Sequence, residues 1–111
     1  MDKPREVTLT DFAEALAAGG AVIDVREPME YRAGHVPGAV LMPLRSVPEK
    51  LAEVPTGQPV YVICASGNRS LQATDFLRSK GIEAYSVAGG TSGWAAGGRE
   101  IVTGALPTAQ A

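Results

Sequence analysis

The sequence has few of the residues that build disulfides and metal sites. Its 111 residues include one cysteine, Cys64, and one histidine, His35. A single cysteine excludes an intramolecular disulfide and any zinc site made of several cysteines. With one histidine, the usual mixed cysteine and histidine sites are excluded too, so we expect no metal and no cofactor. A lone cysteine also suits a reducing compartment, and we therefore expect a cytoplasmic protein.

Long apolar runs and an excess of positive charge are also missing. No stretch approaches the ~20 apolar residues of a membrane-spanning helix, and the polar start 1–6 lacks the apolar core of a signal peptide. Lys and Arg number 10 against 12 Asp and Glu, which gives a formal net charge of −2. Proteins that bind nucleic acid by neutralising phosphates are usually basic. We therefore expect neither a membrane nor a nucleic acid among the partners.

Aromatic residues make up only 5% of the chain, so Val, Leu, Ile and Ala have to build most of the core. The hydrophobic share of 45% is typical of a globular protein and too high for a disordered one. The length fits one domain of the usual ~100–150 residues. We expect this domain at 6–104, between a flexible N-terminus (1–5) and a flexible C-terminal tail (105–111).

Short apolar runs alternate with helical patterns along the chain. Four runs predict strands, at 21–25, 39–42, 59–63 and 84–87. The run at 59–63 has no polar alternation, which is expected of a strand in a sheet covered on both faces. Strands that alternate with helices indicate an α/β fold with a parallel sheet. We expect three layers, with helices on both faces of the sheet.

The helical segments are marked by their ends. Apolar spacing predicts a helix over 9–16 with Thr10 or Asp11 as its cap, and Pro28 opens a short helix that Gly34 ends. Further helices are expected at 46–52, where Ser46 and Glu49 form a capping-box pattern, at 70–80 before Gly81, and around Trp94.

Cys64 begins a loop of small and polar residues between the strongest predicted strand and a helix. The loop reads Cys64-Ala65-Ser66-Gly67-Asn68-Arg69-Ser70. In open α/β sheets, ligands bind beyond the carboxyl ends of the strands. Three features would favour a thiolate at Cys64. They are the unpaired amides at the helix start, a glycine that lets the loop curl, and the charge of Arg69. A helix end contributes at most ~2 kcal/mol, so amide hydrogen bonds have to add to it.

Cys64 has two other interpretations besides a reactive thiolate that accepts one extra sulfur atom. A lone cysteine at a strand end is often a small apolar core residue, although the polar residues that follow Cys64 argue against this. Protein tyrosine phosphatases place five residues between their cysteine and arginine, whereas four separate Cys64 from Arg69. A shorter loop encloses a smaller anion-binding site, which suits one sulfur atom better than a tetrahedral phosphate.

Three segments in order make the sequence resemble the rhodanese-like sulfurtransferases. They are Ile23-Asp24-Val25-Arg26-Glu27 with Glu30-Tyr31 and Gly34-His35-Val36-Pro37-Gly38-Ala39, the loop Cys64–Ser70, and Val87-Ala88-Gly89-Gly90 with Gly93-Trp94. The likeness covers about residues 6–103. It implies a single-domain member of the family, with a three-layer fold around a parallel sheet of about five strands.

The resemblance also implies an activity. A sulfane sulfur would move from a small anionic donor such as thiosulfate to cyanide or a thiol, through a persulfide on Cys64 that rests among the amides of 65–70. A sulfur-relay protein is a possible partner, and the protein would be a monomer or a homodimer. Two alternatives stay open: a persulfide carrier or interaction module loaded by a partner protein, and a cysteine-dependent phosphatase or arsenate reductase.

Several residues are expected to support the site. Asp24 and Arg26 stand two residues apart at a strand end and predict a buried ion pair that braces the loop, and Glu30 is placed in the same polar shell. His35 lies in a Gly-His-Val-Pro-Gly turn and is interpreted as a hydrogen-bonded structural residue rather than an acid or base. Trp94 is expected to pack the last helix onto the sheet.

Three side chains of the loop itself have two interpretations each. For Arg69, attraction of anionic donors is favoured over a role in the shape of the loop. Ser66 and Ser70 either donate hydrogen bonds to the persulfide or cap the helix.

Overall fold

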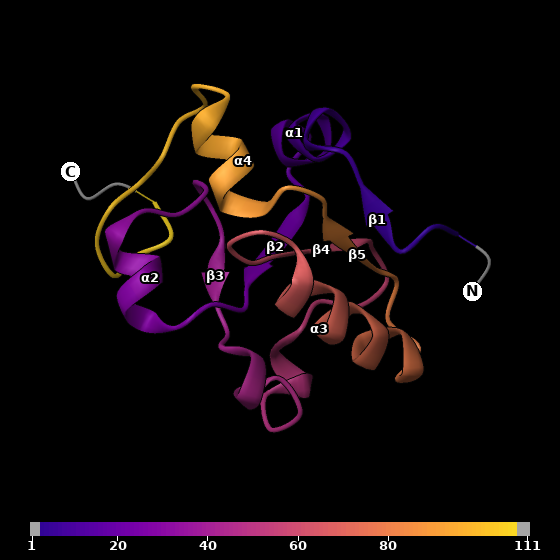
Figure 1. The fold of residues 1–111 in the computed structure, drawn as a ribbon. Coiled ribbons are helices and arrows are strands. Elements are labelled where there is room, and N and C mark those ends of the chain that lie inside the picture. Colours follow the sequence, from indigo (N-terminus) through magenta and orange to yellow (C-terminus); the bar gives the residue numbers. More distant parts are fainter. Residues whose placement is uncertain (1–2, 109–111) are drawn as a thin grey trace.

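The computed structural model describes residues 3–108 (Figure 1). Its five strands are β1 (Glu6–Val7), β2 (Ala21–Asp24), β3 (Val40–Leu41), β4 (Val60–Ile63) and β5 (Ala84–Val87). All neighbouring strands are parallel, and their order in the sheet is β1-β5-β4-β2-β3. The prediction of a parallel sheet of about five strands is confirmed.

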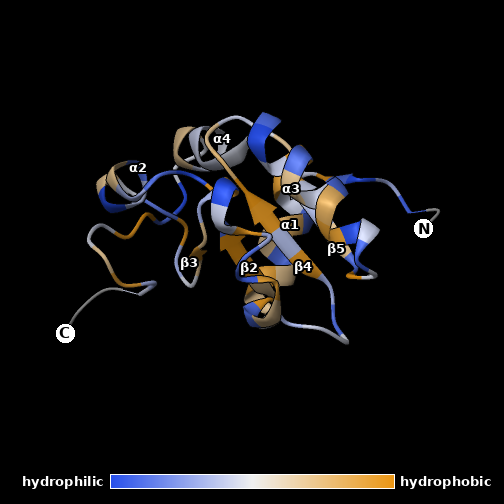
Figure 2. Ribbon diagram, turned by 90° about the horizontal axis from the view of Figure 1, so that it is seen from below, coloured by the Kyte–Doolittle hydropathy of each residue, from blue (hydrophilic) through white to orange (hydrophobic). Residues whose placement is uncertain are grey.

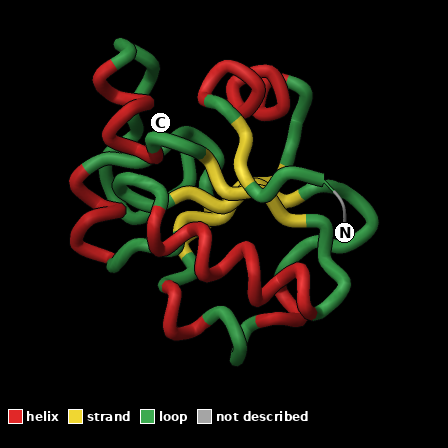
Figure 3. The backbone as a smooth tube through the Cα atoms, turned by 45° about the vertical axis from the view of Figure 1, so that its right-hand side comes forward, coloured by secondary structure: helices red, strands yellow, loops and turns green. Residues whose placement is uncertain are grey.

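Four α-helices surround this sheet. They are α1 (Leu9–Ala17), α2 (Pro28–Ala33), α3 (Asn68–Ser79) and α4 (Gly90–Ala96). Helices α1 and α4 lie over one face, with α2 beside β3, and α3 covers the other face (Figures 1 and 3). The expected three layers are therefore present. Among the described residues, no helix combines the length and the apolar character needed to cross a membrane.

Alternate residues of β4 belong to two separate cores. Val60 and Val62 pack with α3, and Tyr61 and Ile63 belong to the core under α1 and α4. This division follows from the two-residue period of a strand. Figure 2 shows β2 and β4 as the hydrophobic centre of the molecule, with hydrophilic residues on the helices around them. Cys64 continues the series of Val60 and Val62, so its side chain lies on the α3 face.

The strand order places the Cys64 loop at a switch point of the topology. The chain leaves β2 toward β3 on one side, and it leaves β4 toward β5 on the other side. Such a reversal opens a crevice beyond the carboxyl ends of the two central strands. Asp24 is the last residue of β2, and Cys64 follows the last residue of β4. The two predicted site segments therefore meet at this crevice.

Strand β1 is a two-residue strand that the sequence does not predict. It pairs with the edge of β5, where the Ser86 amide donates to the Arg5 carbonyl (2.7 Å) and the Ala88 amide donates to the Val7 carbonyl (3.0 Å). A strand this short carries no periodicity that could be recognised. Its conformation is decided by the free edge of β5, which lies far away in the sequence.

The predicted cap of one helix and the predicted start of another differ from the structure. The cap of α1 is Thr8 rather than Thr10 or Asp11, and its hydroxyl oxygen accepts the Asp11 amide at 3.1 Å. Helix α3 begins at Asn68 rather than Ser70. Helix α1 begins at Leu9 as predicted and only its cap differs, whereas α3 starts two residues early because the polar residues of its first turn do not contribute to apolar spacing.

The predicted helix over 46–52 is wrong. The chain instead forms two short 3-10 turns, Leu44–Ser46 and Leu51–Glu53. The hydroxyl of Ser46 donates to the Pro43 carbonyl at 2.8 Å, which closes the first of these turns. Because the hydroxyl is engaged on that side, it does not cap a following helix.

The two expected flexible ends fall partly outside the described residues, namely at 1–2 and 109–111. The described parts are hydrogen-bonded to the domain. Arg78 donates to the carbonyls of Lys3 (2.9 Å) and Pro4 (2.7 Å), and the Gly38 amide donates to the Pro107 carbonyl (2.9 Å). Flexibility of the two ends stays a prediction.

Replacing Phe12 with alanine is expected to lower the free energy of unfolding by about 3–5 kcal/mol. Phe12 is fully buried, and its ring lies 5.8 Å from that of Tyr61 and 5.4 Å from that of Trp94. Urea unfolding measures the change. Met29→Ala, at a position that is 84% exposed, is the matched control and should change stability by less than about 0.5 kcal/mol. Equal stability of the two variants would contradict this description of the core.

Candidate active site

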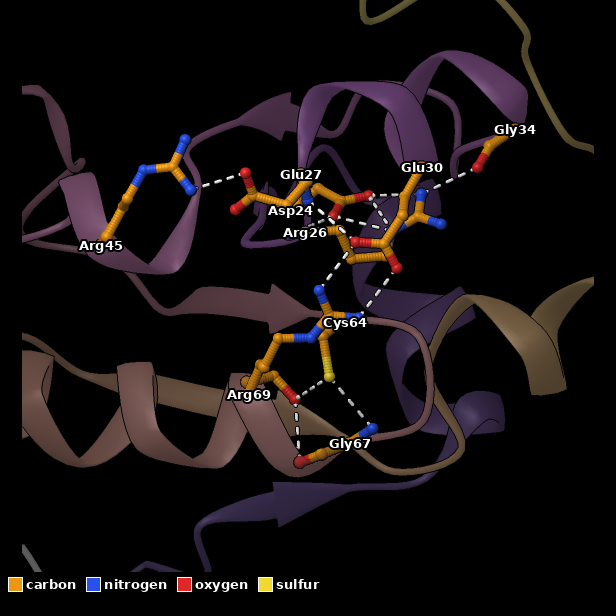
Figure 4. Close-up of polar contacts among 10 residues, drawn as sticks. Asp24, Arg26, Glu27, Glu30, Gly34, Arg45, Cys64, Gly67 and Arg69 are labelled. Atoms are coloured by element: carbon orange, nitrogen blue, oxygen red, sulfur yellow. Dashed lines mark hydrogen bonds and ion pairs between the residues drawn. The ribbon is translucent and has the colours of Figure 1, made fainter.

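The sulfur of Cys64 is buried where β4 passes into the loop before α3 (Figure 4). The Gly67 amide donates to Sγ at 3.1 Å, and the Ser70 hydroxyl oxygen lies 3.3 Å from it. Gly67 has a φ of +121°, a conformation that favours glycine, and this turn brings the chain back toward the sulfur. The loop therefore directs its own amides at Cys64.

Burial and hydrogen bonding act in opposite directions on the pKa of Cys64. Burial is the largest single influence, and it raises the pKa of the thiol because it penalises the charged form. The Ser70 hydroxyl and the amides of Ser70, Gly67 and Ser66 lower the pKa, and together they outweigh burial. The pKa of Cys64 thus lies below its ordinary value, which increases the thiolate fraction near neutral pH.

The start of α4 holds the first two peptide groups of the loop. The Thr91 amide donates to the Cys64 carbonyl at 2.8 Å, and the Ser92 amide donates to the Ala65 carbonyl at 3.0 Å. In a trans peptide, the carbonyl and the following N–H point in opposite directions. Anchoring these two carbonyls on α4 therefore turns the amides of Ala65 and Ser66 away from α4 and toward the interior of the loop.

Gly90 allows this close approach of α4 to the loop. A Cβ at this position would lie 2.5 Å from the carbonyl oxygens of both Cys64 and Ala65. Such a distance is too short for any real contact, so another residue would displace the loop. Sequence reasoning used Gly90 only as part of a family motif and missed this positioning role. The Gly89-Gly90 pair is visible in the sequence, but the need for a glycine at position 90 becomes clear only from the packing of α4 against the loop after β4.

A chain of hydroxyl groups continues from the sulfur into the sheet. The Ser70 oxygen lies 2.7 Å from that of Ser86 on β5 and 3.1 Å from the Gly67 carbonyl. Both serines are fully buried. Ser86 can donate to Ser70 while Ser70 donates to a thiolate at Cys64. Sequence reasoning missed Ser86 because only the pairing of β4 with β5 brings it to the site.

Asp24 and Arg26 form a buried ion pair. Arg26 Nε lies 3.0 Å from Oδ1, and Nη2 lies 2.9 Å from Oδ2. Nη2 also donates to the Gly34 carbonyl at 2.8 Å. The pair therefore connects the end of β2 with the end of α2, and what it braces directly is this connection rather than the Cys64 loop.

Arg69 pairs with Glu30 through two hydrogen bonds, of 2.7 Å and 2.9 Å (Figure 4). The bond from Arg69 and a second one from the Glu27 amide lower the pKa of Glu30 to about 2. Glu30 therefore stays charged near neutral pH and holds the guanidinium beside α2. This placement favours a role of Arg69 in the shape of the loop over attraction of anionic donors.

His35 is a structural residue in this fold. Its Nδ1 lies 2.7 Å from the Tyr31 carbonyl oxygen, and its Nε2 lies 2.8 Å from that of Leu106. The ring stacks on that of Tyr31 with centroids 3.6 Å apart, and the side chain is fully buried. Both nitrogens are engaged with the backbone, so neither is free to act as an acid or base.

The remaining predicted residues lie at the edges of the site. Ser66 and Asn68 are exposed, and Ser66 acts on Cys64 through its amide. Trp94 packs α4 over the sheet as expected, and its Nε1 donates to the Glu100 carbonyl at 2.7 Å. Within residues 3–108, no three His, Cys, Asp or Glu side chains gather as a possible metal site.

Alkylation of Cys64 by iodoacetamide should follow a titration with a midpoint below the ~8.5 of free cysteine. Hydrogen bonds from the loop stabilise the thiolate, so the rate rises at lower pH than for an ordinary thiol. Ser70→Ala should raise the midpoint, because one donor is lost while burial stays. Ser79→Ala, in the last turn of α3, is the control and should keep the wild-type midpoint. A wild-type midpoint at or above the reference value would contradict stabilisation of the thiolate by the loop.

Gly90→Ala should slow alkylation of Cys64 at pH 7 by about tenfold, because the displaced loop loses an amide hydrogen bond to the thiolate. Gly98→Ala is the matched control. Gly98 also has a positive φ, of +77°, but a Cβ there has open space around it. The control therefore carries the backbone strain without the clash. Equal alkylation rates in the two variants would show that the contact with α4 does not position the loop.

Comparisons with known proteins cover most of the chain. Residues 8–97 match the model of the rhodanese-like domain family. The YqhL protein of Bacillus subtilis (strain 168) is 40% identical over 91 residues, which cover 78% of this chain and 71% of that protein. A sulfurtransferase of Allochromatium vinosum is 34% identical over 82 residues, covering 73% and 77% of the two chains.

A crystal structure of a rhodanese-related protein from Thermoplasma volcanium superimposes with a TM-score of 0.82 at 33% identity. The match covers 88% of this chain and 97% of that one. The segment that fits the family model contains the Cys64 loop, the Glu30–Arg69 pair and α4. The fold and the segment that contains the Cys64 loop thus match a known family. This chain belongs to the rhodanese-like sulfurtransferase family.

Proposed function

We propose that this protein is an enzyme that transfers a sulfane sulfur from a donor such as thiosulfate to cyanide or a thiol, through a persulfide on Cys64. The observation that carries the proposal is the set of donors around one buried sulfur. The Gly67 amide at 3.1 Å and the Ser70 hydroxyl at 3.3 Å stabilise negative charge at this place. A thiolate and a persulfide anion both require such stabilisation.

The first half of the reaction loads the cysteine. The Cys64 thiolate attacks the sulfane sulfur of thiosulfate and forms a sulfur–sulfur bond with it. The bond between the sulfane sulfur and the sulfonyl sulfur breaks, and sulfite leaves with the electron pair. Because sulfite leaves as an anion, the step needs no general acid, and an ionised Cys64 needs no general base.

The second half returns the cysteine to its starting state. The carbon of cyanide attacks the outer sulfur of the persulfide and forms thiocyanate, while the Cys64 thiolate leaves with the electrons of the broken bond. A thiolate acceptor would react in the same way and become a persulfide itself. Between the two steps, the amides of the loop and the start of α3 stabilise the charge of the persulfide.

Two features support sulfur transfer over phosphate hydrolysis. Four residues separate Cys64 from Arg69, which makes a small loop. The guanidinium of Arg69 is bound by Glu30 and is not directed at the loop interior. We also propose a reducing compartment such as the cytoplasm, because the reaction requires Cys64 as a free thiol.

Incubation with thiosulfate should increase the intact mass of the protein by one sulfur atom, and cyanide should remove it as thiocyanate. Cys64→Ser, the matched control, should gain nothing, because the nucleophile is lost while size and polarity are nearly kept. No gain in the folded, reduced wild type would contradict transfer from thiosulfate. Rapid loading by a cysteine desulfurase instead would favour a persulfide carrier, and hydrolysis of an aryl phosphate would favour a phosphatase.

A further inference from the structure

The charged side chains next to the Cys64 loop form ion pairs, so their charges sum to zero. Arg26 is paired with Asp24 at 2.9 Å, and Arg69 is paired with Glu30 at 2.7 Å (Figure 4). Stabilisation of the sulfur comes from amide and hydroxyl groups, which carry no formal charge. Once Cys64 is ionised, this group of five residues has a formal charge of −1. A doubly charged donor therefore meets no net positive charge at the sulfur.

Glu30 also lines an open groove next to the segment that holds this loop. The groove has a volume of about 300 Å³ and lies between α2 and α4, with Arg26 and Glu30 on one side and Thr91 and Ser92 on the other. The amides of Thr91 and Ser92 hold the carbonyls of the Cys64 loop, so this wall of the groove is continuous with the site. The Glu30 carboxylate therefore lies at the surface beside the site.

We propose that Glu30 determines the charge of the preferred sulfur donor. By neutralising Arg69, it makes the site favour sulfane donors with one negative charge over thiosulfate, which has two. This inference rests on the proposed function, since it concerns the loading of Cys64. Organic thiosulfonates are the simplest donors of the favoured class.

The pairing of Arg69 with Glu30 is bidentate. Two parallel hydrogen bonds between a guanidinium and a carboxylate fix both the distance and the orientation of the groups. The side chains of Arg69 and Glu30 are only about a third exposed, at 34% and 37%, so water screens the pair incompletely. The low pKa of Glu30 keeps its carboxylate charged throughout the usual assay range. Without this carboxylate, the guanidinium would be free to contact the sulfonyl oxygens of a dianionic donor.

Thiosulfate and benzenethiosulfonate load Cys64 by the same chemistry. In both, the thiolate attacks the sulfane sulfur and the bond to the sulfonyl sulfur breaks. Sulfite leaves from the first donor and benzenesulfinate from the second, each with the electron pair. The leaving groups differ in reactivity, but this difference is the same for every variant. A change between variants in the ratio of the two kcat/KM values therefore reports on the protein.

The test compares wild type with Glu30→Gln for both donors, with cyanide as the acceptor. Glutamine keeps a side-chain oxygen that can accept the Glu27 amide, so the start of α2 is preserved. The ratio of kcat/KM for thiosulfate to that for benzenethiosulfonate should rise about fivefold, as expected for removing one partly screened charge. The rise should shrink at high salt. Circular dichroism checks that the variant is folded.

Asp75→Asn is the matched control. Asp75 lies on α3 and pairs with Arg5 at an exposed position, so this variant loses the same charge away from the groove. It should keep the wild-type ratio of the two donors. An unchanged ratio in Glu30→Gln, or an equal rise in Asp75→Asn, would overturn the proposal. If intact mass shows that neither donor loads the wild type, the proposed function itself fails, and the role of Glu30 fails with it.

Discussion

Backbone hydrogen bonds to a buried sulfur are the interaction on which the rest of this site depends. Burial alone would keep Cys64 protonated, because a charged group loses its hydration inside a protein. The amides that reverse this tendency point inward only if their neighbouring carbonyls point outward. One of them, the Ala65 carbonyl before the Ser66 amide, is held by the start of α4, which can come close enough only because Gly90 has no side chain. The expected reactivity of Cys64 thus depends on the contact between its loop and the start of α4.

The site stabilises an anion without an unpaired cation. Both arginines near the loop are engaged by carboxylates, Arg26 by Asp24 and Arg69 by Glu30. An unpaired guanidinium next to Cys64 would stabilise the thiolate, but it would also bind sulfite and other anions. Amides fixed by the fold stabilise charge only within hydrogen-bond distance. In the proposed reaction, this arrangement would stabilise the persulfide, and Glu30 would determine which donor charge is preferred.

Much of the fold could be predicted because the apolar pattern of each central strand lies within a few consecutive residues. The runs around β2, β4 and β5 are apolar and short, and helices lie between them, so a parallel sheet followed directly. The elements that escaped prediction depend on distant partners. Strand β1 exists because β5 offers a free edge, and Ser46 closes a 3-10 turn where its capping pattern suggested a helix.

The sequence by itself determined the candidate nucleophile, its place at the end of a strand, and the family, because these depend on residue types at short spacing around Cys64. Only the tertiary structure decided what surrounds the sulfur. Ser86 reaches the site through strand pairing, and Arg69 turns to Glu30, 39 residues away in the chain. Local patterns specify elements through backbone geometry over a few residues. Side chains from separate elements meet only when the sheet assembles, so their pairing has no local signature.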